Sequence, residues 1–369
     1  FFGEHQSGIT TPVQDRLHFA AFDMSSTASR DDLVSLLTDW SYAASRMMRG
    51  LPVSKSGAVD GSPILPPDDT GEALDLPPSG LTITFGFGPT LFTTDDGVDR
   101  FGIAGKRPAL LAKLPRFSGD ALQPDAGDGD LCIQACADDP QVAVHAIRNL
   151  SRIAFGRASL RWSQLGFGRT SSTSKSQVTA RNLFGFKDGT ANLKSEDAAA
   201  IDDNVWVDDG SWLSGGSYLV VRKIRMIIEN WDHTRLEEQE RVIGRSKGGG
   251  APLSGGTEFS DFDFTKTGAT GATLIDKNSH VHLAHSSNNH GTQLLRRGYN
   301  FVNGNDDLGR LDAGLFFMSY QRSPEQFITV QRSLSTDALN EYIKHVGSGI
   351  FLVPPGAANG RYVGAGLFA

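Results

Sequence analysis

The sequence lacks two features that would each place it in a large class of proteins. No apolar run approaches the ~18 residues that a membrane-spanning helix needs, so we expect no segment that crosses a bilayer. Basic residues are not in excess: 35 lysines and arginines stand against 42 aspartates and glutamates, which gives a formal net charge of -7. Without any basic run, this balance excludes a general nucleic-acid binder.

Cysteine is scarce, and methionine is missing from the first position. The only cysteines are Cys132 and Cys136. If their segment is a strand, both side chains lie on one face about 13 Å apart, at ~3.3 Å per residue, which is too far for a disulfide. The chain begins with Phe1, so we expect a mature or trimmed product whose targeting segment, if it had one, has been removed.

Apolar residues recur in a pattern that predicts the order strand, helix, strand, strand, helix, strand twice. Ser29 predicts the start of the first helix by a capping box with Asp32, and Thr234 with Glu237 predicts a second box. The first set is expected at residues 16–22, 29–50, 81–87, 130–137, 140–155 and 160–166. The second set is expected at residues 217–228, 234–244, 280–284, 315–320, 323–346 and 350–353, where 323–330 and 336–346 are helical.

Two copies of this unit match the split βαβ, ferredoxin-like motif. We therefore predict an α+β fold of duplicated ferredoxin-like (βαββαβ) domains, of the dimeric α+β barrel type. The expected division is a first domain at residues 1–170, a connector at 171–214 and a second domain at 215–369. Two such sheets leave a cavity between the sheet and helix layers, which is a natural place for a large flat cofactor.

The connector carries a loop with a single carboxylate beside glycine. Residues 181–192 read Arg-Asn-Leu-Phe-Gly-Phe-Lys-Asp-Gly-Thr-Ala-Asn, without a regular period, which indicates a buried or half-buried functional loop. Taken alone, Asp188 is more often a turn residue than a catalyst, because aspartate caps its own backbone and glycine supplies a positive φ. Whether Asp188 is a turn residue or a catalyst therefore depends on the other motifs in the chain.

A second stretch, residues 278–290, holds four of the nine histidines. If it is a strand, His280 and His282 point the same way and can share a zinc ion with a third ligand. Alternatively, one histidine is the axial ligand of a haem iron, and Arg296 and Arg297 approach its other face or its propionates. A polar strand and loop with solvated histidines is the third interpretation, and spacing alone leaves all three open.

Several motifs, taken together, resemble the dye-decolourising peroxidase family, in particular its exported bacterial branch. The family's G-x-x-D-G stands here at residues 185–189, and the flanking residues 182–184 and 190–192 also match. Further matches in family order are residues 2–9 (Phe-Gly-Glu-His-Gln-Ser-Gly-Ile), 129–134 (Gly-Asp-Leu-Cys-Ile-Gln), 216–218 (Gly-Ser-Tyr) and 294–299 (Leu-Leu-Arg-Arg-Gly-Tyr). The likeness runs through nearly the whole chain.

The resemblance implies that haem b binds in the second half, with His280 as the proximal iron ligand. It makes Asp188 the distal carboxylate that moves a proton and Arg296 the distal arginine that stabilises developing charge, with Arg297 as another candidate for that place. The family has H-x-R-L-A around its histidine. This chain has His282 where the arginine stands, which supplies a second candidate ligand.

Other cofactor contacts are expected from the same resemblance and from position in the chain. A proximal histidine usually donates its other ring proton to a carboxylate or carbonyl, and Asp312 is the expected acceptor. The remaining expected haem contacts are Arg181 and Arg222 at the propionates, Gly189 in the G-x-x-D-G motif, and Leu315 and Phe316 as lining of the distal pocket.

The function implied is a haem peroxidase that uses hydrogen peroxide to oxidise dyes and other small-molecule one-electron donors. The alternative is a deferrochelatase-like, haem-handling protein that releases iron, with a possible partner in an iron-uptake or extracellular redox system. A zinc hydrolase is disfavoured because no H-E-x-x-H or comparable set is present. The resemblance also implies export by a twin-arginine signal, hence an extracellular or periplasmic place.

Overall fold

All residues from 1 to 369 are described by the computed structural model, in which nine strands form one antiparallel sheet. The strands are β1 (Arg16–Met24), β2 (Thr82–Phe87), β3 (Leu131–Ala137), β4 (Ala158–Arg169), β5 (Ser217–Met226), β6 (Leu295–Arg296), β7 (Tyr299–Asn305), β8 (Leu311–Gln321) and β9 (Ile343–Val353). Their order is β5-β9-β2-β3-β1-β4-β7-β8-β6, and β5 also pairs with β8. The pairing of β5 with β8 closes the sheet on itself, and β6 pairs with β8.

The closed sheet consists of two halves with the same internal order. The N-terminal half runs β4-β1-β3-β2 and the C-terminal half runs β9-β5-β8-β7. The halves meet where Phe87 of β2 pairs with Leu352 of β9, and where β4 pairs with β7. The predicted α+β fold with duplicated ferredoxin-like units is confirmed, whereas the division at residues 170 and 214 stays a prediction.

Side chains that point into the closed sheet form a core of 22 buried residues. Phe19 contacts Trp162 at 5.1 Å and Phe316 at 5.3 Å between ring centroids. Cys132 and Cys136 belong to this core and are not bonded to each other. The expectation that both cysteines share one face of a strand without a disulfide is confirmed.

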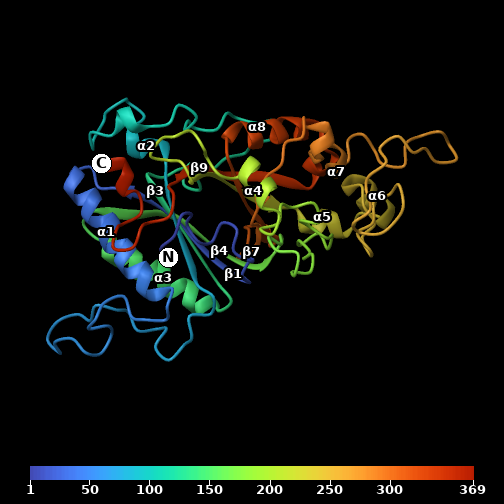
Figure 1. Ribbon diagram of the computed structural model, residues 1–369. Helices are drawn as coiled ribbons and strands as arrows, with labels where there is room; N and C mark the ends of the chain where they lie inside the picture. The colour runs from blue at the N-terminus through green and yellow to red at the C-terminus, as the bar shows by residue number, and fades with distance from the viewer.

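The outer face of the N-terminal half is covered by α1 (Arg30–Met47) and α3 (Pro140–Ala154), as Figure 1 shows. Ser29 caps α1 with the predicted capping box to Asp32. Between helices and sheet lies a core of 41 buried residues. No helix in the chain combines the length and the apolar character required to cross a membrane.

The outer face of the C-terminal half carries shorter helices. They are α5 (Ile228–Asp232), α6 (Leu236–Ile243), α7 (His280–Ala284) and α8 (Pro324–Ser333). Their core contains only 7 buried residues. Two further short helices, α2 (Pro89–Phe92) and α4 (Ala198–Asn204), lie outside this layer.

Several predicted elements in the C-terminal half were wrong. Residues 280–284 form helix α7 instead of a strand, because five residues are too few for a period to separate the two. Residues 343–346 start β9 instead of ending a helix, and the polar strand β7 was not predicted. Thr234 makes no capping box: its hydroxyl donates to the carbonyl of Asn230, and α6 begins at Leu236.

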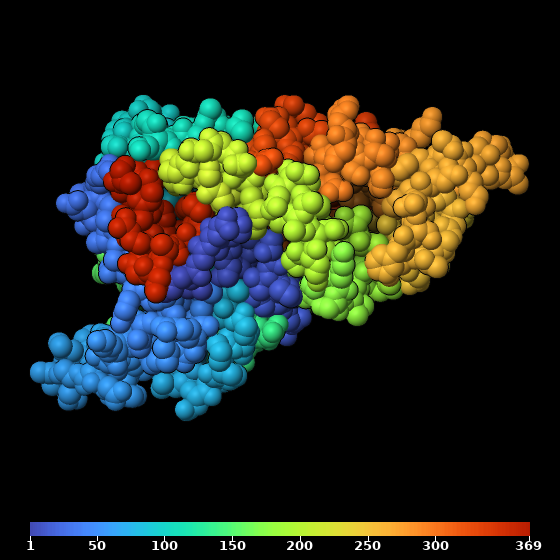
Figure 2. Space-filling view, viewed as in Figure 1, coloured from blue at the N-terminus to red at the C-terminus, as the bar shows by residue number.

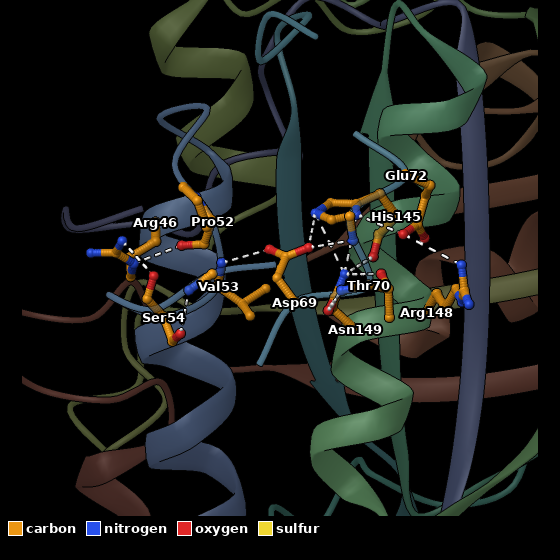
Figure 3. A network of polar contacts seen from close by, with 12 residues as sticks. Arg46, Pro52, Val53, Ser54, Asp69, Thr70, Glu72, His145, Arg148 and Asn149 are labelled. Carbon is orange, nitrogen blue, oxygen red and sulfur yellow. Dashed lines mark hydrogen bonds and ion pairs between the residues drawn. The ribbon is translucent and has the colours of Figure 1, made fainter. Parts of the chain in front are cut away.

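Two long irregular loops, residues 51–79 and 245–275, project from opposite ends of the molecule (Figures 1 and 2). The first is held to α3 by a polar network drawn in Figure 3. Asp69 accepts the backbone N–H of Val53 at 2.9 Å and lies 3.6 Å from the ring of His145. Asn149 of α3 accepts the N–H of Thr70 and donates to its hydroxyl.

Candidate active site

A cavity of about 410 Å³ lies on the outer face of the C-terminal half. Its floor is β5, β8 and β9, and its walls come from α7, α8 and the loop of residues 182–191. Half of its 34 lining residues are hydrophobic, and nearly all of the other half are polar or charged. This composition suits a ligand that has both an apolar body and polar or charged groups.

His280, the first residue of α7, exposes 35% of its side chain, and it lines the cavity. Its Nδ1 lies 2.6 Å from Oδ2 of Asp337, and its Nε2 has no partner within the protein. Burial works to lower the pKa of His280, but the charge and hydrogen bond of Asp337 outweigh it and raise that pKa. One ring nitrogen is thus held by a carboxylate, and the other is free for a ligand.

Asp337 was not predicted from the sequence, and it replaces Asp312 in this role. Its other oxygen, Oδ1, accepts the N–H of Leu339 at 2.8 Å, so the carboxylate is fixed at the start of a 3-10 turn. Asp312 lies on β8, 3.9 Å from Arg225, and its expected bond to His280 was wrong. Predicting a continuous helix over 336–346 hid the capping position that an aspartate before a turn indicates.

Asp188 and Arg296 lie in the same cavity as His280. Oδ1 of Asp188 is 3.0 Å from Nη1 of Arg296, and Oδ2 accepts a hydrogen bond from Asn182 at 3.3 Å. The charges of both Asp188 and Arg296 affect the pKa of His280 although no bond joins them to it. The structure therefore gathers the carboxylate, the arginine and the histidine that the sequence singled out.

Gly189 lines the cavity and is needed there for conformational reasons. Its φ is +80°, in the left-handed region that favours glycine. A Cβ on Gly189 would lie 3.0 Å from the backbone of Ser171. Gly189 thus lets the loop turn tightly after Asp188 and pack against Ser171 at the start of the connector.

Two of the expected cavity residues point the other way because successive strand residues alternate between faces. On β8, Leu315 lines the cavity, but Phe316 points into the closed sheet, and Phe317 takes the place expected for it. On β6, Arg296 faces the cavity, whereas Arg297 is 0% exposed and bonds to Gln14 at 2.6 Å. The expectations for Phe316 and Arg297 were wrong.

Neither arginine expected at a propionate is suited to bind one: Arg181 by its place and Arg222 by its ion pair. Arg181 lies outside the cavity and bonds to the carbonyls of Gly185 and Lys247, both at 2.7 Å. Arg222 lines the cavity, but its guanidinium is 1% exposed and is already ion-paired with Asp120. Arg181 was therefore misplaced by sequence reasoning, and Arg222 has its charge neutralised within the protein.

Arg245 is the residue that sequence reasoning missed on this wall. It follows α6, lines the cavity, and lies over the ring of Phe262 at 4.5 Å from the centroid. Its hydrogen bonds go to backbone carbonyls, those of Gly250 at 2.6 Å and Glu258 at 2.9 Å, and not to any carboxylate. Arg245 can therefore meet an anionic group of a ligand.

The geometry supplies no zinc site. His282 follows His280 by two residues on a helix, so the rings diverge, and His282 lies edge-on to Phe264 at 4.7 Å. No three side chains of histidine, cysteine, aspartate or glutamate are arranged to hold a metal ion together. The cavity offers the imidazole of His280 with its Nδ1 held by Asp337, apolar side chains and Arg245, a set that fits haem.

Family models match both halves of the chain. The model described as "Dyp-type peroxidase, N-terminal" matches residues 6–168, and "Dyp-type peroxidase, C-terminal" matches residues 179–358. Among curated proteins, a deferrochelatase of Yersinia pseudotuberculosis is 36% identical over 98% of this chain and 82% of its own. A dye-decolorizing peroxidase of Thermobifida fusca is 38% identical over 98% of this chain and 83% of its own.

Solved structures agree with the sequence matches. Ferric DtpA from Streptomyces lividans superposes with a TM-score of 0.90 at 41% identity and covers 100% of this chain and 96% of its own. A DyP-type peroxidase from Streptomyces coelicolor gives 0.89 at 42% identity, covering 99% and 95%. The sequence matches and the structural matches both cover the two halves of the chain. The chain belongs to the Dyp-type peroxidase family.

Proposed function

We propose that, in this haem peroxidase, His280 would hold the haem iron through its free ring nitrogen, while Asp188 and Arg296 act on hydrogen peroxide. One observation carries this assignment. Of the three histidines that line the cavity, only His280 has one ring nitrogen bonded to a carboxylate, that of Asp337, and it shares the cavity with a carboxylate–guanidinium pair. Haem is the cofactor of the family, and the donor set described above fits it.

Each of these side chains has one task that its chemistry allows. When bound, the haem supplies the redox chemistry. Asp188 takes a proton from one oxygen of hydrogen peroxide and returns it to the other, and its bonds to Arg296 and Asn182 fix its orientation. Arg296 has only donors and keeps its charge, so it stabilises the negative charge on the departing oxygen. Asp337 holds the Nδ1 proton of His280 and makes the ring a stronger ligand.

The test is the rate at which the ferric protein reacts with hydrogen peroxide, followed by its absorption spectrum in a stopped-flow instrument. Asp188→Asn should lower this rate by about 100-fold or more, because a general acid–base group is lost. Arg296→Leu should lower it by about 100-fold as well, through loss of charge stabilisation. Asp312→Asn is the matched control and should leave it unchanged. Haem-loaded variants at positions 188 and 296 that both react at the parent rate would refute the assignment.

Small aromatic donors and dyes are the proposed reducing substrates. The support is the Thermobifida fusca relative, which carries the name dye-decolorizing peroxidase and matches 98% of this chain. Steady-state turnover with an anthraquinone dye and with a phenol, each dependent on peroxide, would test the proposal. Consumption of peroxide without oxidation of either donor would count against it.

Iron release from haem is the second proposed function, with a possible role in an iron-uptake system. Several curated relatives named deferrochelatase, from Yersinia and Escherichia coli, cover 98–100% of this chain at 36–37% identity. Mass spectrometry of the extracted porphyrin after incubation with haem distinguishes the two functions. Iron-free protoporphyrin would support iron release, and intact haem throughout would reject it.

Action outside the cytoplasm is also proposed, on the likeness of the motifs to the exported branch of the family. Expression of the full-length gene in cells with and without a working twin-arginine pathway, followed by fractionation, is the test. Protein that reaches the extracellular or periplasmic fraction only when that pathway works is the expected result. Equal cytoplasmic retention in both strains would reject the proposal.

A further inference from the structure

Asp188 and Arg296 are 108 residues apart in the chain and come from different kinds of structure. Asp188 sits in an irregular loop, and Arg296 ends β6, a strand of two residues at the end of the strand order. The pair works only if loop and strand keep a fixed separation. A misplacement of about 1 Å can cost a factor of about 100 in rate.

Three hydrogen bonds join the loop of residues 182–192 to β6. One is the Asp188–Arg296 contact itself. The other two both come from the side chain of Asn192: Oδ1 accepts the N–H of Arg296 at 2.8 Å, and Nδ2 donates to the carbonyl of Arg296 at 2.9 Å. Apart from the functional pair, the connection therefore depends on a single amide.

The amide of Asn192 satisfies the backbone of Arg296 in the way that a neighbouring strand would. Arg296 pairs with Ser319 of β8 on one side, and Asn192 takes both its N–H and its carbonyl. Nδ2 of Asn192 also donates to the carbonyl of Ser172 at 3.0 Å, which ties in the connector. Asn192 is 6% exposed, so water cannot replace these bonds without rearrangement.

We propose that Asn192 is a positioning residue of the peroxide site: it sets the place of the Arg296 guanidinium relative to Asp188 by clamping the Arg296 backbone to the loop. This inference rests on the proposed roles of Asp188 and Arg296. Asn192 itself does not line the cavity. It acts on the reaction only through Arg296.

The first variant is Asn192→Ala, measured in the haem-loaded enzyme. We expect haem content and the Soret position to be retained and the peroxide rate to fall by about 10- to 100-fold. The dissociation constant of cyanide for the ferric protein, a binding readout independent of turnover, should rise by about 10-fold, because Arg296 no longer meets the bound anion at its best position.

Asn149→Ala is the matched control. Asn149 is also a buried asparagine, 1% exposed, and its amide likewise accepts one bond and donates another, from the backbone N–H and to the hydroxyl of Thr70 in the loop of residues 51–79 (Figure 3). It should lower the melting temperature as much as Asn192→Ala does, and leave both the peroxide rate and the cyanide affinity unchanged. A purely structural role of Asn192 would make the two variants behave alike, which would overturn the proposal.

Asn192→Asp adds a readout that stability alone does not give. The isosteric carboxylate can still accept from Arg296, but its second oxygen faces the carbonyls of Arg296 and Ser172 without a proton to donate. We expect the peroxide rate of Asn192→Asp to be low at neutral pH and to recover on acidification, when the protonated carboxyl can donate again. Asn192→Ala should show no such recovery. If Asn192→Ala fails to fold, the recovery of Asn192→Asp at low pH becomes the test of the proposal. Absence of that recovery overturns the proposal.

Failure of this inference is distinguishable from failure of the proposed function. Normal peroxide rates in Asn192→Ala together with slow rates in Asp188→Asn and Arg296→Leu would reject the clamp alone. Normal rates in all three would reject the roles of Asp188 and Arg296 themselves, and the clamp with them.

Discussion

The two halves share one strand order, yet one is filled and the other is hollow. In the N-terminal half, α1 with 18 residues and α3 with 15 residues cover the outer face of the sheet, and this half supplies 31 of the 41 residues of the buried core beneath them. In the C-terminal half, α8 has 10 residues and α7 has 5, and a cavity of about 410 Å³ takes the place of the core. Shortening the helical cover is thus what makes room for a cofactor.

The halves also treat their long loops in parallel ways with different consequences. In the N-terminal half, Asp69 fixes residues 51–79 above a packed core. In the C-terminal half, Glu258 fixes residues 245–275 by an ion pair with Lys187 and a bond from Thr190 at 3.2 Å. Lys187 and Thr190 flank Asp188 and Gly189, so in this half the anchored loop touches the site itself.

The largest expected difference between the halves comes from replacing one histidine in each half with alanine. His280→Ala should weaken haem binding by at least about 100-fold, because the iron loses its axial ligand. His145→Ala, in the network of Figure 3, should bind haem as the parent does. Titration of haem into each purified protein, followed at the Soret band, measures both. Equal affinities for the two variants would remove the functional distinction between the halves.

One phenylalanine in each half tests whether the outer face of the N-terminal half is more tightly packed than that of the C-terminal half. Phe85→Ala in the filled half should lower the free energy of unfolding by about 3–5 kcal/mol, since Phe85 is 2% exposed and stacks against Trp40. Phe317→Ala should cost the haem-free protein less than about 2 kcal/mol, because Phe317 already borders empty space. Urea unfolding gives both values. A reversed order would contradict the contrast.

Two aspartates of the C-terminal half, Asp337 and Asp312, test which carboxylate acts on His280. Asp337→Asn should weaken haem binding by about 10-fold or more and lower the frequency of the iron–histidine stretch, because an amide makes His280 a poorer donor. Asp312→Asn, which loses only a contact with Arg225, should change neither. Resonance Raman spectra of the reduced proteins are the measurement. An unchanged stretch in Asp337→Asn would show that this bond does not tune the ligand.

The last prediction concerns the pH dependence of stability, and both halves contribute to it. Burial lowers the pKa of His18 on β1 to about 4, and burial is also the main cause that lowers the pKa of His345 on β9 to about 4. Between pH 6.5 and 4 each histidine takes up a proton in the unfolded chain but not in the folded one. Stability should therefore fall as the pH drops through this window, by roughly 3 kcal/mol at most for each.

His18→Gln should remove its share of this dependence. Melting temperatures of the parent and the variant, recorded from pH 7 down to pH 4, would show the variant's curve as the flatter one. A parent whose stability does not change over this range would mean that the two histidines are protonated in the folded state.

How far the sequence predicts this molecule depends on whether a residue's position follows from a local pattern. The Ser29 cap, the strand at 131–137 and the loop with Asp188 were readable because capping boxes, apolar runs and glycines act within a few residues. The family resemblance favoured Arg296 over Arg297, but the residue pattern alone could not show which of them faces the cavity, since that depends on which face of β6 meets it. Asp337 was missed because its partner His280 is 57 residues away. Arg245 was missed because no local pattern after α6 shows that it faces the cavity.

The closed sheet has a consequence for solubility during folding and storage. An open sheet of this size would present strand edges with unpaired N–H and carbonyl groups, on which other chains can add. Here the edge strands of each half pair with those of the other, β2 with β9 and β4 with β7. These junctions are short: Phe87–Leu352 is the pair between β2 and β9, and β4 pairs with β7 at residues 167–169. β6 is two residues long, and Asn192 binds the backbone N–H and carbonyl of Arg296. The duplicated fold therefore shortens the strand edges on which another chain could add.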